Sequence, residues 1–236
     1  MKRVLKAGAM GIALISGAAA QAQLSDAERA AVLARLPADD GSDMADATRG
    51  KIAEIPGGVI KTADGKTVWD ASAFDFLKAE TAPATVHPSL WRQARLNHIH
   101  GLFEIVPGKV WQLRGYDIAV MTIISGKTGW IVVDPLLTEE AAAAAMQLAE
   151  SKIGKRPISA VLFSHSHADH FGGVGGILSP DDAKKRKVPI VAPHGFAEEA
   201  VSENVLAGNA MTRRSSYMFG TALAPGVQGR VDNGLG

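Results

Sequence analysis

The order of the predicted elements indicates an α/β (α+β) fold. Four short runs of strand-forming residues lie between residues 103 and 133, and turn sequences separate them. A helix-type stretch follows at 139–152, and an apolar run at 158–163 has the length and β-branched content of a buried strand. A cluster of histidines comes directly after this strand, where α/β proteins usually place their functional sites.

Residues 1–22 have the features of a secretory signal peptide. Basic side chains precede an apolar run at 7–20, and a small-x-small pattern at 20–22 marks a cleavage point. We expect cleavage after Ala22 and a periplasmic or secreted mature protein. A membrane anchor is the alternative. No stable membrane span is expected, because the run is shorter than the roughly 20 strongly apolar residues that cross a bilayer.

Residues 23–100 are predicted to form an N-terminal extension and linker. Ser25 and Glu28 have the spacing of a capping box at the start of a short helix. The polar stretch at 38–50 is expected to be a loop, and an Asp-Gly turn predicts a small hairpin over 59–69. Four apolar side chains are expected to anchor the extension on the main domain: Phe74, Phe76, Leu77 and Trp91.

The main domain is expected at residues 101–236. It begins with the four strand-type runs, whose spacing predicts an antiparallel meander. Thr138, followed by two glutamates, is expected to cap the helix that extends to about Lys152. The runs of the meander are residues 103–106, 110–113, 118–124 and 130–133.

The segment after the histidine cluster continues with shorter elements. We expect a short helix at 174–178, a polar loop at 179–187, a strand at 188–192 and a helix at 196–206. Residues 210–236 are rich in glycine and polar side chains, and no closing element is expected there. The apolar face of the helix at 196–206 consists of Phe196, Ala200, Val201 and Val205.

The composition excludes several classes of site and partner. The chain of 236 residues has no cysteine, so disulfides, a thiol nucleophile and cysteine-ligated metal sites are ruled out. Its formal charge is +1, and loss of residues 1–22, with three basic and no acidic side chains, would change it to −2. A near-neutral surface gives no electrostatic reason to expect nucleic acid as a partner.

Three histidines and one aspartate lie within six residues, at His165, His167, Asp169 and His170. In an extended segment His165 and His167 point the same way, and the turn that follows can bring Asp169 and His170 toward the same cavity. Imidazole and carboxylate are the zinc ligands available without thiolate. Two such pairs would form half of a dinuclear site, in which two Zn²⁺ ions share an activated water. A lone histidine is more often structural, but this cluster is hard to explain by packing.

The His-x-His-x-Asp-His pattern after a strand resembles the signature of the metallo-β-lactamase superfamily, from about residue 102 onward. The resemblance implies a metallo-β-lactamase-like αββα sandwich, in which each half contributes strands and helices and the metals sit at one edge. The order of elements matches the first half of such a sandwich. We therefore expect that half together with the N-terminal extension.

Three longer segments, at 96–108, 129–135 and 202–217, are similar to the type III (linear or secondary) alkylsulfatases. The resemblance implies a zinc-dependent hydrolase that splits small-molecule alkyl sulfates, such as dodecyl sulfate, into alcohol and inorganic sulfate. It also implies one zinc ion on His165 and His167 and a second on Asp169 and His170. A homodimer is implied for a full-length parent protein.

The sequence departs from this family after the motif. The family completes its metal site with carboxylates and a histidine well downstream, whereas 66 residues follow His170 here. We therefore expect a truncated chain with part of the fold and part of the metal site, and its activity alone is left open. The candidates for further ligands are His194, Glu198, Glu199 and Glu203, on or beside a helix where acidic side chains are usually solvated.

Other polar residues have more ordinary expected roles. His98 and His100 are expected to be structural, and Asp134 is expected to cap or orient the motif loop. Arg213 and Arg214 could meet a sulfate or simply form a surface pair. Two alternatives to the alkylsulfatase are kept: another hydrolase of the superfamily, such as a β-lactamase, lactonase or thioesterase, and an inactive secreted fragment.

Overall fold

The structure is a computed structural model that describes residues 25–37 and 40–232. The predicted signal peptide at 1–22 lies outside these residues, so cleavage after Ala22 stays a prediction. Within the described part of the chain, no helix has the length and apolar character that crossing a membrane requires.

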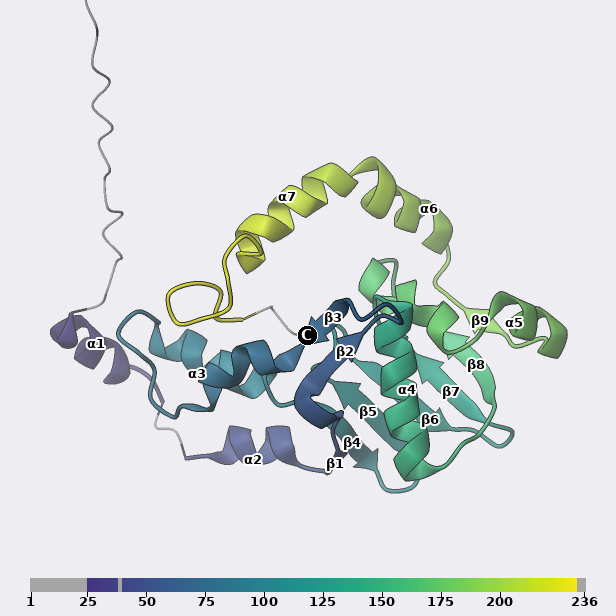
Figure 1. Ribbon diagram of the computed structural model, residues 1–236, viewed down its shortest axis with the longest axis horizontal. Coiled ribbons are helices and arrows are strands. Elements are labelled where there is room, and N and C mark those ends of the chain that lie inside the picture. The colour runs from purple at the N-terminus through teal and green to yellow at the C-terminus, as the bar shows by residue number, and fades with distance from the viewer. Residues whose placement is uncertain (1–24, 38–39, 233–236) are drawn as a thin grey trace, which may run out of the picture.

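A seven-stranded mixed sheet forms the centre of the molecule, with β2 and β3 in a separate hairpin (Figure 1). Each neighbouring pair from β1 to β7 is antiparallel, whereas β7, β8 and β9 run parallel. The strands of the sheet, in spatial order, are β1 (Lys51–Ala53), β4 (Gly101–Val106), β5 (Val110–Arg114), β6 (Met121–Ser125), β7 (Trp130–Val133), β8 (Ile158–Leu162) and β9 (Ile190–Val191).

The predicted meander is confirmed as β4 to β7. The largest difference in a boundary is at β6, which begins at Met121 and not at Ile118. Asp117 explains the difference: its carboxylate accepts the backbone N–H groups of Ile118 and Leu137, which binds this stretch to the loop after β7 and not to a neighbouring strand.

Helix α4 (Glu139–Ile153) connects β7 to the parallel strand β8 and packs on the sheet (Figure 1). Thr138 caps it as predicted, since its side chain accepts the N–H of Ala141. Alanine side chains make most of its buried face, and their small size allows the helix to lie close to the strands. The buried residues of this face are Ala141, Ala142, Ala145, Met146 and Ala149.

The N-terminal extension contributes to the same body. The capping box of α1 (Asp26–Leu33) and the predicted hairpin, formed by β2 (Val59–Lys61) and β3 (Thr67–Asp70), are both confirmed. Strand β1 of the extension joins the edge of the main sheet. The predicted domain boundary at residue 101 stays a prediction. The remaining elements of the extension are α2 (Ser42–Thr48), the 3₁₀ helices η1 (Pro56–Gly58) and η2 (Ala71–Lys78), and α3 (Pro88–Asn97).

A second, smaller core anchors this extension. Phe74, Leu77 and Trp91 are buried in it and Phe76 packs against it. Among the described residues this cluster is separate from the main core, so the predicted anchoring on the main domain is seen only through the C-terminal tail. Val231 from the C-terminal tail completes the cluster. The tail is therefore packed on the extension, with Thr85 donating a hydrogen bond to the carbonyl oxygen of Val227 at 2.6 Å.

Three helices lie where loops or an open tail were expected: α2, α5 (Pro180–Arg186) and α7 (Gly208–Phe219). Helix α5 has clear local causes. Ser179 caps it by accepting the N–H of Asp182, and Pro180 occupies its first turn. Acidic side chains lie in its first turn and basic ones in its last turn, where they interact favourably with the helix dipole. The structure therefore has a short, solvated helix where a polar loop was expected at 179–187.

Helix α6 (Phe196–Val201), the π-helical turn η5 (Ser202–Leu206) and α7 form an arch that leaves the sheet after β9 (Figure 1). The prediction of a packed apolar face on this helix was wrong in part, because Val201 and Val205 are 51% and 70% exposed. Phe196 is the exception, since it stacks on Phe163 with ring centroids 5.4 Å apart.

Replacing Gly173 with alanine tests the close packing behind the motif. An added Cβ would lie 2.2 Å from the carbonyl oxygen of Pro135 and 2.6 Å from that of Thr138. We expect the free energy of unfolding, measured by urea denaturation, to fall by about 1–3 kcal/mol, the usual cost of overpacking.

The matched control is Gly208→Ala at the start of α7, where an added Cβ meets nothing within 4 Å. Alanine favours a helix over glycine by up to about 1 kcal/mol, so no loss is expected there. Equal stability of the Gly173→Ala variant and the unchanged protein would contradict the tight approach.

Candidate metal centre

The motif lies in the loop after β8, beside the end of β7. Residues Ala168–His170 form the 3₁₀ helix η3, and Gly172–Gly176 form a second one, η4, close to the helix predicted at 174–178. The loop is held from behind, because Gly173 N–H donates to the carbonyl oxygen of Leu136 at 2.8 Å. Gly172 and Gly173 lie so close to the segment before α4 that a side chain would clash with its carbonyl oxygens.

Asp134 fixes the start of the motif. Its Oδ1 accepts the N–H of Ser164 at 2.7 Å, and its Oδ2 accepts the Ser164 hydroxyl at 2.6 Å and faces His170 Nδ1 at 2.9 Å. The residue has a positive φ of 54°, a conformation that aspartate adopts more readily than most side chains. The structure confirms the prediction that Asp134 orients the motif loop.

The four predicted ligands come together as two contacting pairs. The rings of His165 and His167 lie 4.6 Å apart between centroids, and His165 also lies 4.0 Å from His170. His170 Nε2 is 3.2 Å from Asp169 Oδ2. Among the residues that the structure describes, no three His, Asp or Glu side chains are placed to hold one metal ion. The side chains therefore form a cluster of donors and not a finished coordination sphere.

The hydrogen bonds of His165 and His170 decide which ring nitrogens remain for a metal. The Ser164 hydroxyl donates to the Asp134 carboxylate, so its oxygen accepts from His165 Nδ1, 2.9 Å away. Because a carboxylate only accepts, His170 Nδ1 carries the hydrogen that points at Asp134. The Nε2 atom of each ring therefore points away from these partners, and that of His170 faces Asp169 Oδ2.

A bound cation fits this set of donors. His170 Nε2 and Asp169 Oδ2 lie 3.2 Å apart, so either a proton on the nitrogen or a metal ion bound by both atoms would make this contact favourable. Burial, and then the neighbouring His170 and His167, lower the pKa of His165, which favours the neutral imidazole that metals require. Nitrogen and oxygen donors of this kind suit Zn²⁺.

Asp117 is a buried carboxylate that the sequence reasoning missed. It is 5% exposed and accepts the N–H groups of Ile118 at 2.6 Å and Leu137 at 2.8 Å. Burial raises the pKa of its carboxyl group, and the negative charge of Asp169 raises it further. No pattern around Asp117 distinguishes it from a turn residue, so only the folded chain reveals its place beside the motif.

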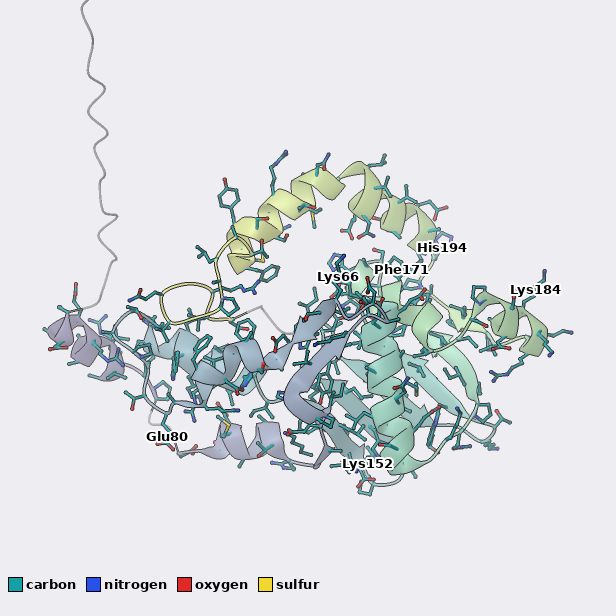
Figure 2. The ribbon with its side chains drawn as sticks, in the orientation of Figure 1. Lys66, Glu80, Lys152, Phe171, Lys184 and His194 are labelled. Carbon is teal, nitrogen blue, oxygen red and sulfur yellow. The ribbon has the colours of Figure 1, made fainter. Side chains whose placement is uncertain are left out.

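Three aromatic rings, also missed, join the motif to the arch. Phe171 follows His170 directly, and its ring lies 5.9 Å from Phe163 and 5.2 Å from Phe196, the first residue of α6. Figure 2 places Phe171 at the motif end of α4 and His194 near the start of α6. The cluster of Phe163, Phe171 and Phe196 thus sets where the arch begins.

The other candidates are distributed around the molecule. Glu203 reaches the motif, with Oε2 3.2 Å from His167 Nε2. His194, Glu198, Glu199, Arg213 and Arg214 are exposed. His98 Nε2 lies 3.6 Å from Asp75 Oδ1, and the His100 ring packs on Tyr116, so their structural role stays a prediction that these contacts agree with.

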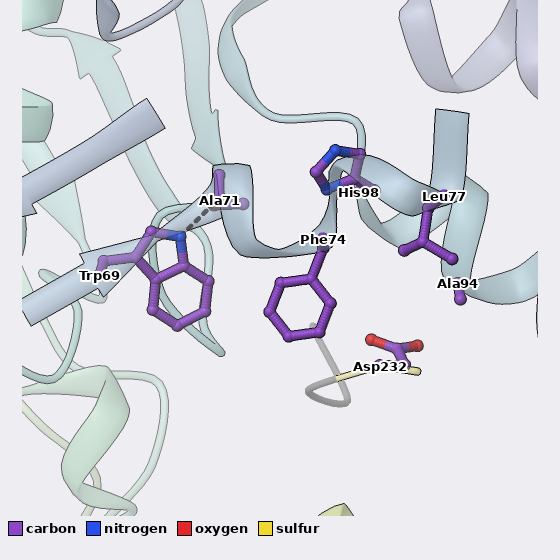
Figure 3. A pocket seen from close by; sticks show the side chains of 8 residues that line it. Trp69, Ala71, Phe74, Leu77, Ala94, His98 and Asp232 are labelled. Carbon is purple, nitrogen blue, oxygen red and sulfur yellow. Dashed lines mark hydrogen bonds between the residues drawn. The ribbon is translucent and has the colours of Figure 1, made fainter. Parts of the chain in front are cut away.

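A small pocket lies elsewhere, between η2, α3 and the C-terminal tail (Figure 3). Its walls are mostly apolar, and Trp69 is held at its edge by a 2.9 Å hydrogen bond to the carbonyl oxygen of Gly115. None of the four predicted ligands lines this pocket, so it is separate from the donor cluster.

A model of the metallo-beta-lactamase superfamily matches residues 114–233. An (R)-specific secondary-alkylsulfatase of Pseudomonas sp is 50% identical over 212 residues, which are 90% of this chain and 32% of that protein. The alkyl/aryl-sulfatase BDS1 of Saccharomyces cerevisiae is 48% identical over 205 residues, covering 87% of this chain and 32% of the relative.

The fold is also similar to a solved structure, that of the stereoselective inverting sec-alkylsulfatase Pisa1 from Pseudomonas sp. The TM-score is 0.84 at 49% identity, over 91% of this chain and 34% of the other. The predicted fold class and the resemblance to alkylsulfatases are confirmed. The chain spans about a third of the length of the curated relatives it matches.

Asp117→Asn tests the buried carboxylate through the pH dependence of stability. The pKa of Asp117 in the folded chain is raised above the ordinary aspartate value of about 3.9. Its contribution to the free energy of unfolding therefore falls as the pH rises from that value through the folded pKa. The variant has no such group, so we expect the advantage of the unchanged protein over it to shrink as the pH rises. Parallel stability curves from urea denaturation would contradict this.

Proposed function

The chain belongs to the metallo-beta-lactamase superfamily, and on that premise we propose that it is a zinc-dependent hydrolase of alkyl sulfate esters. The observation that carries the proposal is that the donor cluster lies within a segment about 50% identical to alkylsulfatases. The chain spans about a third of those relatives, so the activity of the whole protein is part of the proposal.

His165 and His167 would hold one zinc ion, and Asp169 and His170 the other. When bound, zinc lowers the pKa of water and offsets the negative charge of a sulfate group. The chain itself orients the donors: Asp134 and Ser164 keep the Nδ1 hydrogens of His170 and His165 turned away from the metal side. Such partners raise the basicity of ligating histidines.

The proposed reaction adds water to the ester and releases an alcohol and hydrogen sulfate. Sulfate esters are chosen over the β-lactams, lactones and thioesters of other superfamily members because three curated relatives at 47% to 50% identity are named as two alkylsulfatases and one alkyl/aryl-sulfatase. Export to the periplasm or outside the cell, supported by the pattern of residues 1–22, is part of the same proposal. Retention of Met1 in the purified mature protein would argue against export.

Zinc binding is the first prediction. Calorimetric titration of the metal-free protein is expected to show zinc binding, which Asp169→Ala weakens by more than about 100-fold, because losing a ligand should exceed the 10–100-fold effect of losing an outer partner. His194→Ala, at an exposed histidine of the loop before α6, is the matched control and should leave the affinity unchanged. Equal affinity of the unchanged protein and the Asp169→Ala variant would contradict the assignment.

Substrate class is the second prediction. The zinc-loaded protein is expected to release sulfate from dodecyl sulfate faster than it opens nitrocefin or a homoserine lactone. The same assay in water labelled with heavy oxygen shows which bond breaks, because the label ends in sulfate after S–O cleavage and in the alcohol after C–O cleavage. Turnover of nitrocefin or of the lactone without release of sulfate would instead place the chain among the other hydrolases of the superfamily.

A further inference from the structure

The turn between α6 and α7 carries two adjacent side chains that reach the motif loop. Ala207 N–H donates to the carbonyl oxygen of Ser202, five residues earlier, at 2.8 Å, which is the hydrogen bond that defines a π-helical turn. From this turn, Asn204 Nδ2 donates to the carbonyl oxygen of Ser166 at 3.3 Å, and Glu203 Oε2 lies 3.2 Å from His167 Nε2. Single π-helical turns are frequent at functional sites.

The Glu203 carboxylate has an unsatisfied oxygen at this contact. Its Oε2 atom is buried and, among the described residues, accepts no hydrogen bond of good geometry, although His167 Nε2 is within reach. The Glu203 and His167 side chains are 35% and 52% exposed, and a small rotation of the His167 ring that aligns its Nε2–H would give this buried oxygen a donor. Hydrogen bonds at functional sites are often misaligned before a ligand binds and tighten afterwards.

His167 would then match its two neighbours. His165 and His170 each use one ring nitrogen to contact a polar side chain, Ser164 and Asp134 respectively. Histidines that bind metals commonly donate the second N–H to a carboxylate, which fixes the tautomer and the orientation of the ring. In His167, the nitrogen that faces a carboxylate is Nε2.

We propose that Glu203 is a positioning residue, whose carboxylate accepts the Nε2–H of His167 and leaves Nδ1 as the metal-binding atom. The inference rests on the proposed zinc site, because it assigns a role toward the metal that His167 would hold. It goes further by assigning that role to a residue 36 positions after His167, on a different element. The arch would thereby contribute to the metal centre without contacting the metal.

The tautomer of His167 can be measured in the metal-free protein by long-range ¹H–¹⁵N NMR correlation. The measurement is made at about pH 8, above the ordinary histidine pKa of about 6.5, because only a neutral ring has a tautomer to report. We expect the Nε2–H form in the unchanged protein. Glu203→Met has a similar length and no acceptor and should lose this preference, whereas Glu203→Gln keeps an acceptor oxygen and should retain it. His167→Ala identifies the signal.

Zinc affinity gives the second readout. Glu203→Met is expected to weaken zinc binding by about 10–100-fold, the usual effect of removing the outer partner of a ligand. Glu203→Gln should keep most of the zinc affinity of the unchanged protein. Glu199→Met, at an exposed position of α6, is the matched control and should change neither readout. An unchanged His167 tautomer in Glu203→Met would overturn the inference even if zinc binds tightly. Absence of zinc binding to the unchanged protein would overturn the proposed function instead, while the metal-free measurement stays valid.

Discussion

The geometry of the donor cluster depends on the carboxylate of Asp134. One side chain at the end of β7 contacts the backbone and hydroxyl of Ser164 and the ring of His170, so it binds both ends of the motif to the neighbouring strand. The hydrogens on His165 and His170 are placed by this same group, directly or through Ser164.

Small residues make the surroundings of the cluster rigid. The glycines of η4 lie against the carbonyl oxygens before α4, and the alanines of α4 lie against the sheet. Both contacts bring backbone close to backbone, which leaves little free volume behind the motif loop. The polar groups of the site therefore lie on closely packed backbone, which limits their movement, as a preorganised metal site needs.

Much of the fold could be predicted from local sequence patterns. The meander, the capped helix and the parallel strand each follow from periodicity and turn residues within one segment. Helix α5 was missed because its charged residues resemble a solvated loop, although Ser179 and Pro180 mark its start. The apolar positions Val201 and Val205 suggested a packed face, yet the arch leaves them exposed, and no local pattern reports this.

The site was predictable to the extent that its residues are neighbours in the chain. Four donors within six residues stand out without a structure, and Asp134 was noticed because it ends a strand. Asp117 and the contact of Glu203 with His167 could not be predicted, since each depends on how separate segments meet in the folded chain. Contacts of this kind follow from packing and not from propensity.

The parallel pairing of β7 with β8 also has a consequence for the order of folding. Asp134 and Ser164 are 30 residues apart, and α4 lies between them as the crossover that parallel strands require. Their contact closes a long loop, so we expect it to form after the local hairpins of the meander, whose turns are short. On this order a newly made chain would have the antiparallel meander of β4 to β7 before it has either the parallel strands or the donor cluster, and an ion that it meets early would find no prepared site.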